Sequence, residues 1–201
     1  MRESVFTPAY AGAPRRRLLL AAAGALVAGV TPAVSAQDAP RLQESLVKAA
    51  FLHKFASFVE WPEGTFSSPT APLRIGVLGD PQVGRELRDL ARDRDRDGRP
   101  VVVTALNPGD PLTGHHILYL RAASPVRISE LLTQVPDGVL TVADSDGAHP
   151  RGSVLSFFID DGRVRFGASL EAAARQKLRL SPRLVSIARS VRAPGVGQAV
   201  A

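Results

Sequence analysis

The chain has 201 residues with 45% hydrophobic content and a net charge of +6, and it contains no cysteine. The lack of cysteine excludes thiol catalysis, cysteine-based zinc sites and disulfide bonds. The densest charged run, residues 88–99, largely alternates arginine and aspartate, so its field cancels within a Debye length of ~8–10 Å. Proteins that bind nucleic acid gather positive charge on one face, and the alternation therefore argues against a nucleic-acid partner.

Residues 1–36 have the features of a cleavable export signal. Arginines at 15–17 precede the apolar run 18–30, and the small residues at 34–36 resemble a signal-peptidase site. An apolar run of 13 residues is too short for the ~30 Å hydrocarbon core, so a retained anchor is the less favoured alternative. Arginines followed by leucines are typical of a twin-arginine signal, and a Sec signal with several arginines has the same pattern. Cleavage near Ala36 leaves 21 basic and 18 acidic residues, a net charge of +3.

The first predicted helix, residues 41–60, carries one strongly apolar face. Val47, Phe51, Phe55 and Phe58 recur at helical spacing and form a single stripe. Proline at position 62 stops the helix and holds the preceding tryptophan in extended geometry. We expect the stripe to cover either a sheet or a partner subunit.

The following segments alternate between strands and helices. Strands are predicted at 73–78, 100–106, 116–120 and 139–142, with helices at 85–93 and 126–134. A hairpin follows at 153–159 and 163–168, around Asp161-Gly162, and helices close the chain at 169–177 and 182–192. This order predicts an α/β fold, a three-layer α/β/α sandwich with a mixed, mostly parallel sheet and a C-terminal β-hairpin. We expect one domain, residues 37–192, between the signal and a flexible tail, 193–201.

The turn at residues 79–84 nearly matches a phosphate-binding loop. Arg85 stands where that motif has lysine, and Glu86 stands where it has the magnesium-binding hydroxyl. Nucleotide hydrolysis is therefore disfavoured, which leaves a weak anion site at the helix N-terminus or a plain turn.

Other polar sets fail for geometric reasons. His53, Ser57 and Glu60 share one helix face, but side chains on one straight helix splay apart and do not converge on a reacting atom. The adjacent histidines at 115–116 point to opposite faces of a strand, and the acidic run at 144–147 lacks the spacing of a calcium loop. We predict no catalytic residue, no metal site and no cofactor.

The C-terminal segment is basic and offers the best candidates for binding an anion. Arg179 and Ser181 flank a predicted helix start, where charge and free backbone N–H groups meet, and Arg183 and Arg189 follow. The alternative is ordinary solvation of a helix with favourable charge near its C-terminal end.

The order of these segments resembles the YfiR/HmsC family of small periplasmic proteins. The resemblance covers roughly residues 44–191 and rests on a set of motifs: the Glu-Trp-Pro corner at 60–62, the Gly-Asp-Pro turn at 79–81 and the Asp-Gly-Arg-Val-Arg-Phe hairpin at 161–166. The family pattern includes a cysteine just before the strand at 116–120 in many relatives, where this chain has His115.

The resemblance implies regulation rather than catalysis. YfiR-like proteins are dimeric periplasmic α/β/α domains that repress an inner-membrane diguanylate cyclase, and an outer-membrane lipoprotein can sequester them. Release of repression raises cyclic-di-GMP and favours biofilm formation. The alternative is a periplasmic module that binds a small anion and serves another membrane sensor, such as a histidine kinase.

A partner or dimer contact is expected near the aromatic helix. An exposed aromatic at a corner is a frequent hot spot of protein interfaces, and packing in the core is the competing interpretation for Trp61. The predicted contact residues are Phe51, Phe55, Phe58, Glu60 and Trp61.

Overall fold

The computed structural model describes residues 38–92, 99–145 and 149–193. The predicted signal at 1–36 and the predicted tail beyond residue 193 lie outside these ranges. Within them, every helix is too short or too polar to span a bilayer.

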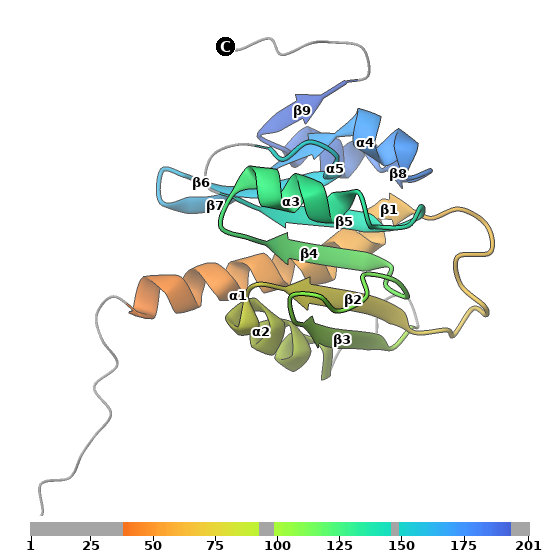
Figure 1. Ribbon diagram of the computed structural model, residues 1–201, viewed down its shortest axis with the longest axis horizontal. Coiled ribbons are helices and arrows are strands. Elements are labelled where there is room, and N and C mark those ends of the chain that lie inside the picture. Colours follow the sequence, from red (N-terminus) through yellow and green to blue (C-terminus); the bar gives the residue numbers. More distant parts are fainter. Residues whose placement is uncertain (1–37, 93–98, 146–148, 194–201) are drawn as a thin grey trace, which may run out of the picture. The chain divides into compact units, whose positions relative to one another are not determined.

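Seven strands of the described chain form one mixed sheet in the order β3-β2-β4-β5-β6-β7-β9 (Figure 1). Their bounds are β2 Leu73–Leu78, β3 Val101–Leu106, β4 Ile117–Arg121, β5 Leu140–Asp144, β6 Leu155–Asp160, β7 Arg163–Ser169 and β9 Ser190–Arg192. All neighbouring pairs are parallel except β6 and β7, which form the antiparallel hairpin. The predicted mixed, mostly parallel sheet with a C-terminal hairpin is confirmed.

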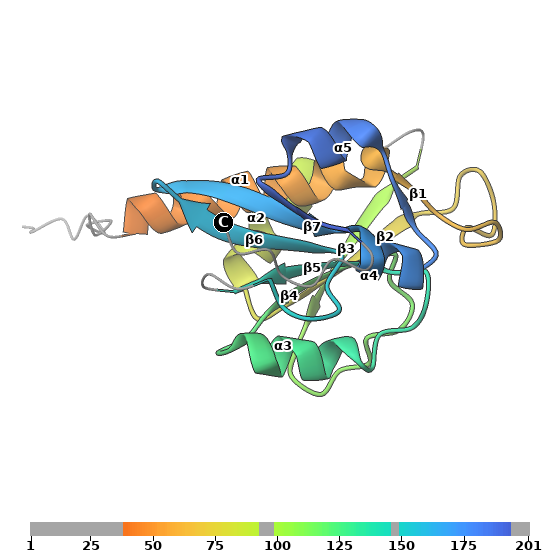
Figure 2. The same ribbon diagram turned by 90° about the horizontal axis from the view of Figure 1, so that it is seen from above.

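Helices cover both faces of this sheet, as the three-layer prediction requires (Figure 2). The helices are α1 Asp38–Phe55, α2 Pro81–Arg92, α3 Pro125–Leu132, α4 Leu170–Arg175 and α5 Pro182–Ile187. Alternate residues of each central strand enter two separate cores: Ile117 and Tyr119 face α1 and α2, while Leu118 and Leu120 face α3. Helices α4 and α5 complete the first of these cores.

The phenylalanine stripe of α1 packs on the sheet, which is one of the two surfaces, sheet or partner subunit, that it was expected to cover. Phe55 is 1% exposed, and its ring lies 5.8 Å from that of Phe157 and 5.1 Å from that of Phe166. Phe51 contacts the same two rings at 6.0 and 5.6 Å. These stacked, tilted and edge-on contacts add to the burial of large apolar surface and fix α1 over β6 and β7.

The ends of the predicted first and last helices are wrong, for a shared reason. The first helix gives way to a 3₁₀ turn, η1 Ala56–Phe58, and a short strand, β1 Val59–Glu60, which pairs with β8 Arg179–Leu180. The last helix ends at Ile187 and continues as β9, where the Arg189 backbone N–H donates to the Phe166 carbonyl at 2.9 Å. Hydrogen bonds to distant strands override the local helical pattern at both places.

Candidate functional site

The carboxyl ends of the parallel strands meet at a point where the chain order reverses. Strand β2 lies between β3, the edge strand, and β4, which is followed by β5 and β6 (Figure 1). In open α/β sheets, ligands bind in the crevice outside the carboxyl ends of the strands at such a switch point. The crevice between β2 and β4 is therefore the first place to look for a site.

The turn after β2 places a carboxylate at this crevice. Gly79 has a φ of +85°, and a Cβ atom there would lie 2.0 Å from the Arg121 carbonyl oxygen, so only glycine fits. Asp80 follows, and its Oδ1 accepts hydrogen bonds from the backbone N–H groups of Gln82 and Val83, both at 3.0 Å. Asp80 thus caps α2. This cap occupies the helix N-terminus and favours the plain-turn interpretation over a weak anion site.

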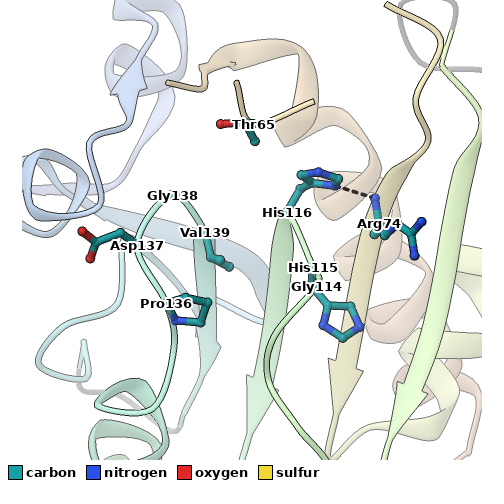
Figure 3. A pocket seen from close by; sticks show the side chains of 9 residues that line it. All are labelled: Thr65, Arg74, Gly114, His115, His116, Pro136, Asp137, Gly138 and Val139. Atoms are coloured by element: carbon teal, nitrogen blue, oxygen red, sulfur yellow. Dashed lines mark hydrogen bonds between the residues drawn. The ribbon is translucent and has the colours of Figure 1, made fainter. Parts of the chain in front are cut away.

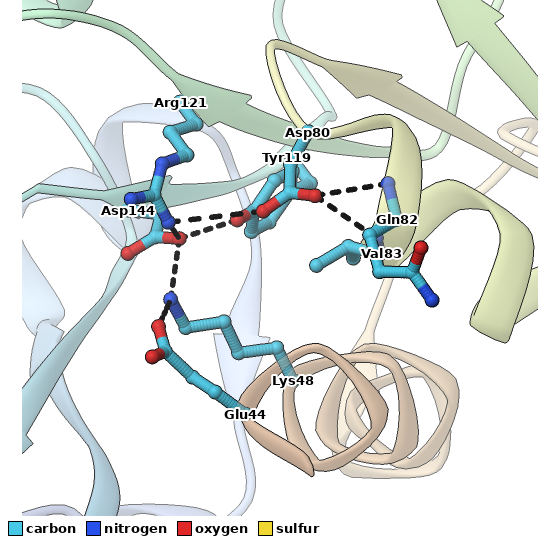
Figure 4. A network of polar contacts seen from close by, with 8 residues as sticks. All are labelled: Glu44, Lys48, Asp80, Gln82, Val83, Tyr119, Arg121 and Asp144. Carbon is cyan, nitrogen blue, oxygen red and sulfur yellow. Dashed lines mark hydrogen bonds and ion pairs between the residues drawn. The ribbon is translucent and has the colours of Figure 1, made fainter. Parts of the chain in front are cut away.

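Strands β4 and β5 end in polar side chains that converge on one carboxylate (Figure 4). The Oδ2 atom of Asp144 accepts hydrogen bonds from Lys48 Nζ at 2.7 Å, from Arg121 Nη1 at 3.0 Å and from the Tyr119 hydroxyl. Lys48 comes from α1 and also donates to Glu44 Oε1 at 2.5 Å. We call these residues, together with Asp80, the switch-point network.

The centre of the network is buried, and this sets its electrostatics. Lys48 is 2% exposed and Tyr119 is fully buried. Burial, followed by the charge of Asp144, raises the pKa of Tyr119 well above its usual value, so the hydroxyl keeps its proton and acts as a donor. Burial alone would lower the pKa of Arg121, but Asp144, Tyr119 and Asp80 together raise it. Both groups therefore hold their donor forms throughout the physiological range.

A cavity of about 530 Å³ opens beside this network. Its walls come from the first turns of α1, the turn after β2 and the end of β4. It is lined by Arg41, Leu42, Glu44, Ser45, Asp80, Gln82 and Arg121.

Sequence reasoning missed most of the switch-point network. It considered Asp144 only as the start of a calcium loop, of which residues 146–148 lie outside the described residues. A usable signal existed: polar residues directly follow buried strands at positions 80, 121 and 144, and carboxyl ends of parallel strands share one sheet edge. Lys48 was detectable as a charge within a predominantly apolar stretch of helix.

The amino ends of β4 and β5 border a second, smaller cavity of about 300 Å³ (Figure 3). His116 Nδ1 accepts a hydrogen bond from the Arg74 backbone N–H at 2.9 Å, and its ring stacks on Phe66 at 4.5 Å. Burial lowers the pKa of both His115 and His116, so both rings favour the neutral form. In the described part of the chain, no three potential ligands gather where a metal ion could bind.

The predicted contact residues divide between the core and the surface. Phe55 is buried, Phe51, Phe58 and Trp61 are partly buried against the first core, and Glu60 is exposed. The Trp61 ring meets Phe66 edge-on at 5.8 Å. Its indole Nε1 is buried without a hydrogen-bond acceptor among the described residues.

The predicted anion-binding residues have other partners. Arg179 lies 3.6 Å from Glu60, and Arg189 lies 3.1 Å from Asp160. Ser181 caps α5 by accepting from the Leu184 backbone N–H at 3.2 Å, and Arg183 is exposed. An anion site on these four residues stays a prediction.

The fold and the switch-point network define a compact α/β domain whose polar centre is built around salt bridges. A family model described as YfiR/HmsC-like matches residues 45–189, which is most of the chain, and the protein therefore belongs to this family. The match confirms the resemblance drawn from the sequence motifs. No curated protein matches the chain. At the level of the family, membership supports a periplasmic regulator of diguanylate cyclase, and members are regulators rather than enzymes.

Proposed function

We propose that this protein binds an inner-membrane diguanylate cyclase from the periplasmic side and represses it, which lowers cyclic-di-GMP and biofilm formation. The observation that carries the proposal is the YfiR/HmsC-like match, which runs from α1 to the residue before β9. Export with cleavage near Ala36, assembly as a homodimer and sequestration by an outer-membrane lipoprotein belong to the same proposal.

The corner after η1 is the proposed contact surface for the cyclase. Glu60 has a side-chain exposure of 72%, and Trp61 beside it is only partly covered. A partly exposed aromatic ring next to a charge is a composition typical of interface hot spots. Phe51 and Phe58 are partly buried against the first core, and Phe55 belongs to that core.

Co-purification with the membrane partner tests this proposal. The full chain, tagged at its C-terminus and purified with detergent-solubilised membranes, should capture a protein with a periplasmic domain and a cyclase domain. Deletion of the gene should raise cellular cyclic-di-GMP. A deletion strain with unchanged cyclic-di-GMP, or a folded periplasmic protein that captures no cyclase, would overturn the proposal.

A charge reversal at the corner locates the contact. We expect Glu60→Lys to weaken capture of the cyclase by about tenfold, because charges at an interface rim steer association and exclude wrong pairings. The matched control is Glu171→Lys on α4, whose side chain is 54% exposed. Equal capture by both variants would remove the corner from the interface.

A further inference from the structure

The acceptors that line the switch-point cavity already bind donors of the protein. The Oδ1 of Asp80 already accepts two backbone N–H groups, and its Oδ2 lies 3.7 Å from Arg121 Nη1. Glu44 offers one oxygen to Lys48. One oxygen of Asp80 and one of Glu44 are therefore already in use within the protein.

Arg121 has donors to spare. Both of its carboxylate contacts, to Asp144 and to Asp80, use the single atom Nη1. A guanidinium group carries five N–H donors in a planar fork, and 41% of this side chain is exposed where it lines the cavity. The planar arrangement matches the oxygens of a carboxylate or a phosphate.

Ser45 adds a hydroxyl donor to the wall of the cavity. The residue is 8% exposed and lines the cavity, yet its hydroxyl makes no hydrogen bond within the described residues. The hydroxyl is therefore available to donate a hydrogen bond to an anion in the cavity.

Charge does not exclude an anion from this cavity. The cavity lining and the network together carry equal numbers of positive and negative side chains. The positive side chains are Arg41, Lys48 and Arg121. The negative side chains are Glu44, Asp80 and Asp144. Each carboxylate contacts a cation of the same set. Arg41 adds an exposed cation at the rim.

We propose that the switch-point cavity binds a small organic anion through a carboxylate or phosphate group. Arg121 and the Ser45 hydroxyl hold the anionic group, and Arg41 attracts it from the rim. The volume of about 530 Å³ lies within the ~300–1,000 Å³ typical of small-molecule sites. This site is separate from the proposed cyclase contact, so either proposal stands if the other fails.

Binding at this site would act on α1. Arg121 and Lys48 both donate a hydrogen bond to the Oδ2 atom of Asp144. An anion that pairs with Arg121 therefore changes the electrostatic interaction between Asp144 and Lys48. Arg41 and Ser45 belong to α1 itself. Occupation of the cavity therefore stabilises the docking of this helix against the strand ends.

Nuclear magnetic resonance titration of the isotope-labelled full chain tests the site. The probes are sodium acetate and inorganic phosphate at constant ionic strength, with chloride as the reference. We expect saturable shifts of the backbone signals of Ser45, Asp80 and Arg121 with at least one probe, with a Kd on the order of a millimolar for so few contacting atoms. Saturable shifts with acetate alone, with phosphate alone or with both probes would show which oxyanion the site prefers.

Variants decide whether these residues hold the anion. Ser45→Ala and Arg121→Gln should each weaken binding by about tenfold, whereas Arg127→Gln on the opposite face of the sheet should leave it unchanged. Ser45→Ala leaves every contact of the switch-point network in place, so it remains informative if Arg121→Gln destabilises the fold. Absence of saturable shifts in the native protein, or binding that survives both substitutions, would overturn the proposal. Loss of binding in Arg179→Gln alone would place the anion at the C-terminal segment instead.

Discussion

Removal of Lys48 is the sharpest test of the switch-point network. In Lys48→Met the carboxylate of Asp144 stays buried and loses one of three donors. Breaking a buried ion pair on one side costs ~3–5 kcal/mol, because an uncompensated charge remains in the interior. Arg121 still pairs with Asp144, and Glu44 is 32% exposed and can be hydrated. We therefore expect the lower end, a loss of about 3 kcal/mol in the free energy of unfolding.

Urea unfolding followed by fluorescence measures this loss. Trp61 is the single tryptophan and packs against the first core, so its emission reports on the whole domain. With a slope of ~1–3 kcal/mol per molar urea, the loss should lower the midpoint by roughly 1–3 M. The control is Lys54→Met, the same change at an exposed position of the same helix, which should stay within about 0.5 kcal/mol of the native protein.

A double-mutant cycle separates the ion pair from lost packing. Lys48→Met and Asp144→Asn should be non-additive by about 1 kcal/mol or more, because residues in one buried network share their interaction energy. An additive result, or a Lys48→Met variant as stable as the native protein, would show that the network contributes little to stability.

Two further predictions concern single residues. Gly79→Ala should destabilise the fold by more than ~2 kcal/mol, because the strain of a positive φ adds to a contact of 2.0 Å with the Arg121 carbonyl. The control is Gly109→Ala, which has φ +98° and no atom within 4 Å, and it should lose only ~1 kcal/mol in the same urea assay. Burial lowers the pKa of His149, whose Nε2 lies 2.9 Å from the Ser153 carbonyl oxygen. The unfolded chain therefore binds the proton more readily, and stability should fall as pH drops through ~6.5 towards the folded pKa. The free energy of unfolding of a His149→Gln variant should fall less steeply between about pH 7.5 and 5.5 than that of the native protein. An unchanged dependence of stability on pH would contradict this assignment.

The elements with clear periodicity were predictable, and those made by distant partners were not. Strand β2 was predicted with its observed bounds, and the stripe of α1 was identified from its helical spacing, because both patterns are local. The strands β1, β8 and β9 are two or three residues long and exist through pairing with strands far away in the chain. No local pattern marks such segments.

The candidate site was hidden for a related reason. Lys48 and Asp144 are 96 residues apart, and their contact depends on the order in which the parallel strands lie. That order follows from the crossover connections, which hydropathy does not encode. The Gly-Asp-Pro turn was recognised, but its function as a backbone cap became evident only from the two N–H groups that Asp80 accepts.

The placement of α1 over the far strands has a consequence for biosynthesis. This helix leaves the ribosome before any strand of the main sheet, yet its aromatic face packs on Phe157 and Phe166, more than a hundred residues later. Until β6 and β7 are made, Phe51 and Phe55 lack their ring partners Phe157 and Phe166. Non-local contacts of this kind slow folding and leave apolar surface open to chaperones and to aggregation. Translation must therefore reach the C-terminal hairpin before the aromatic face of α1 can be fully covered.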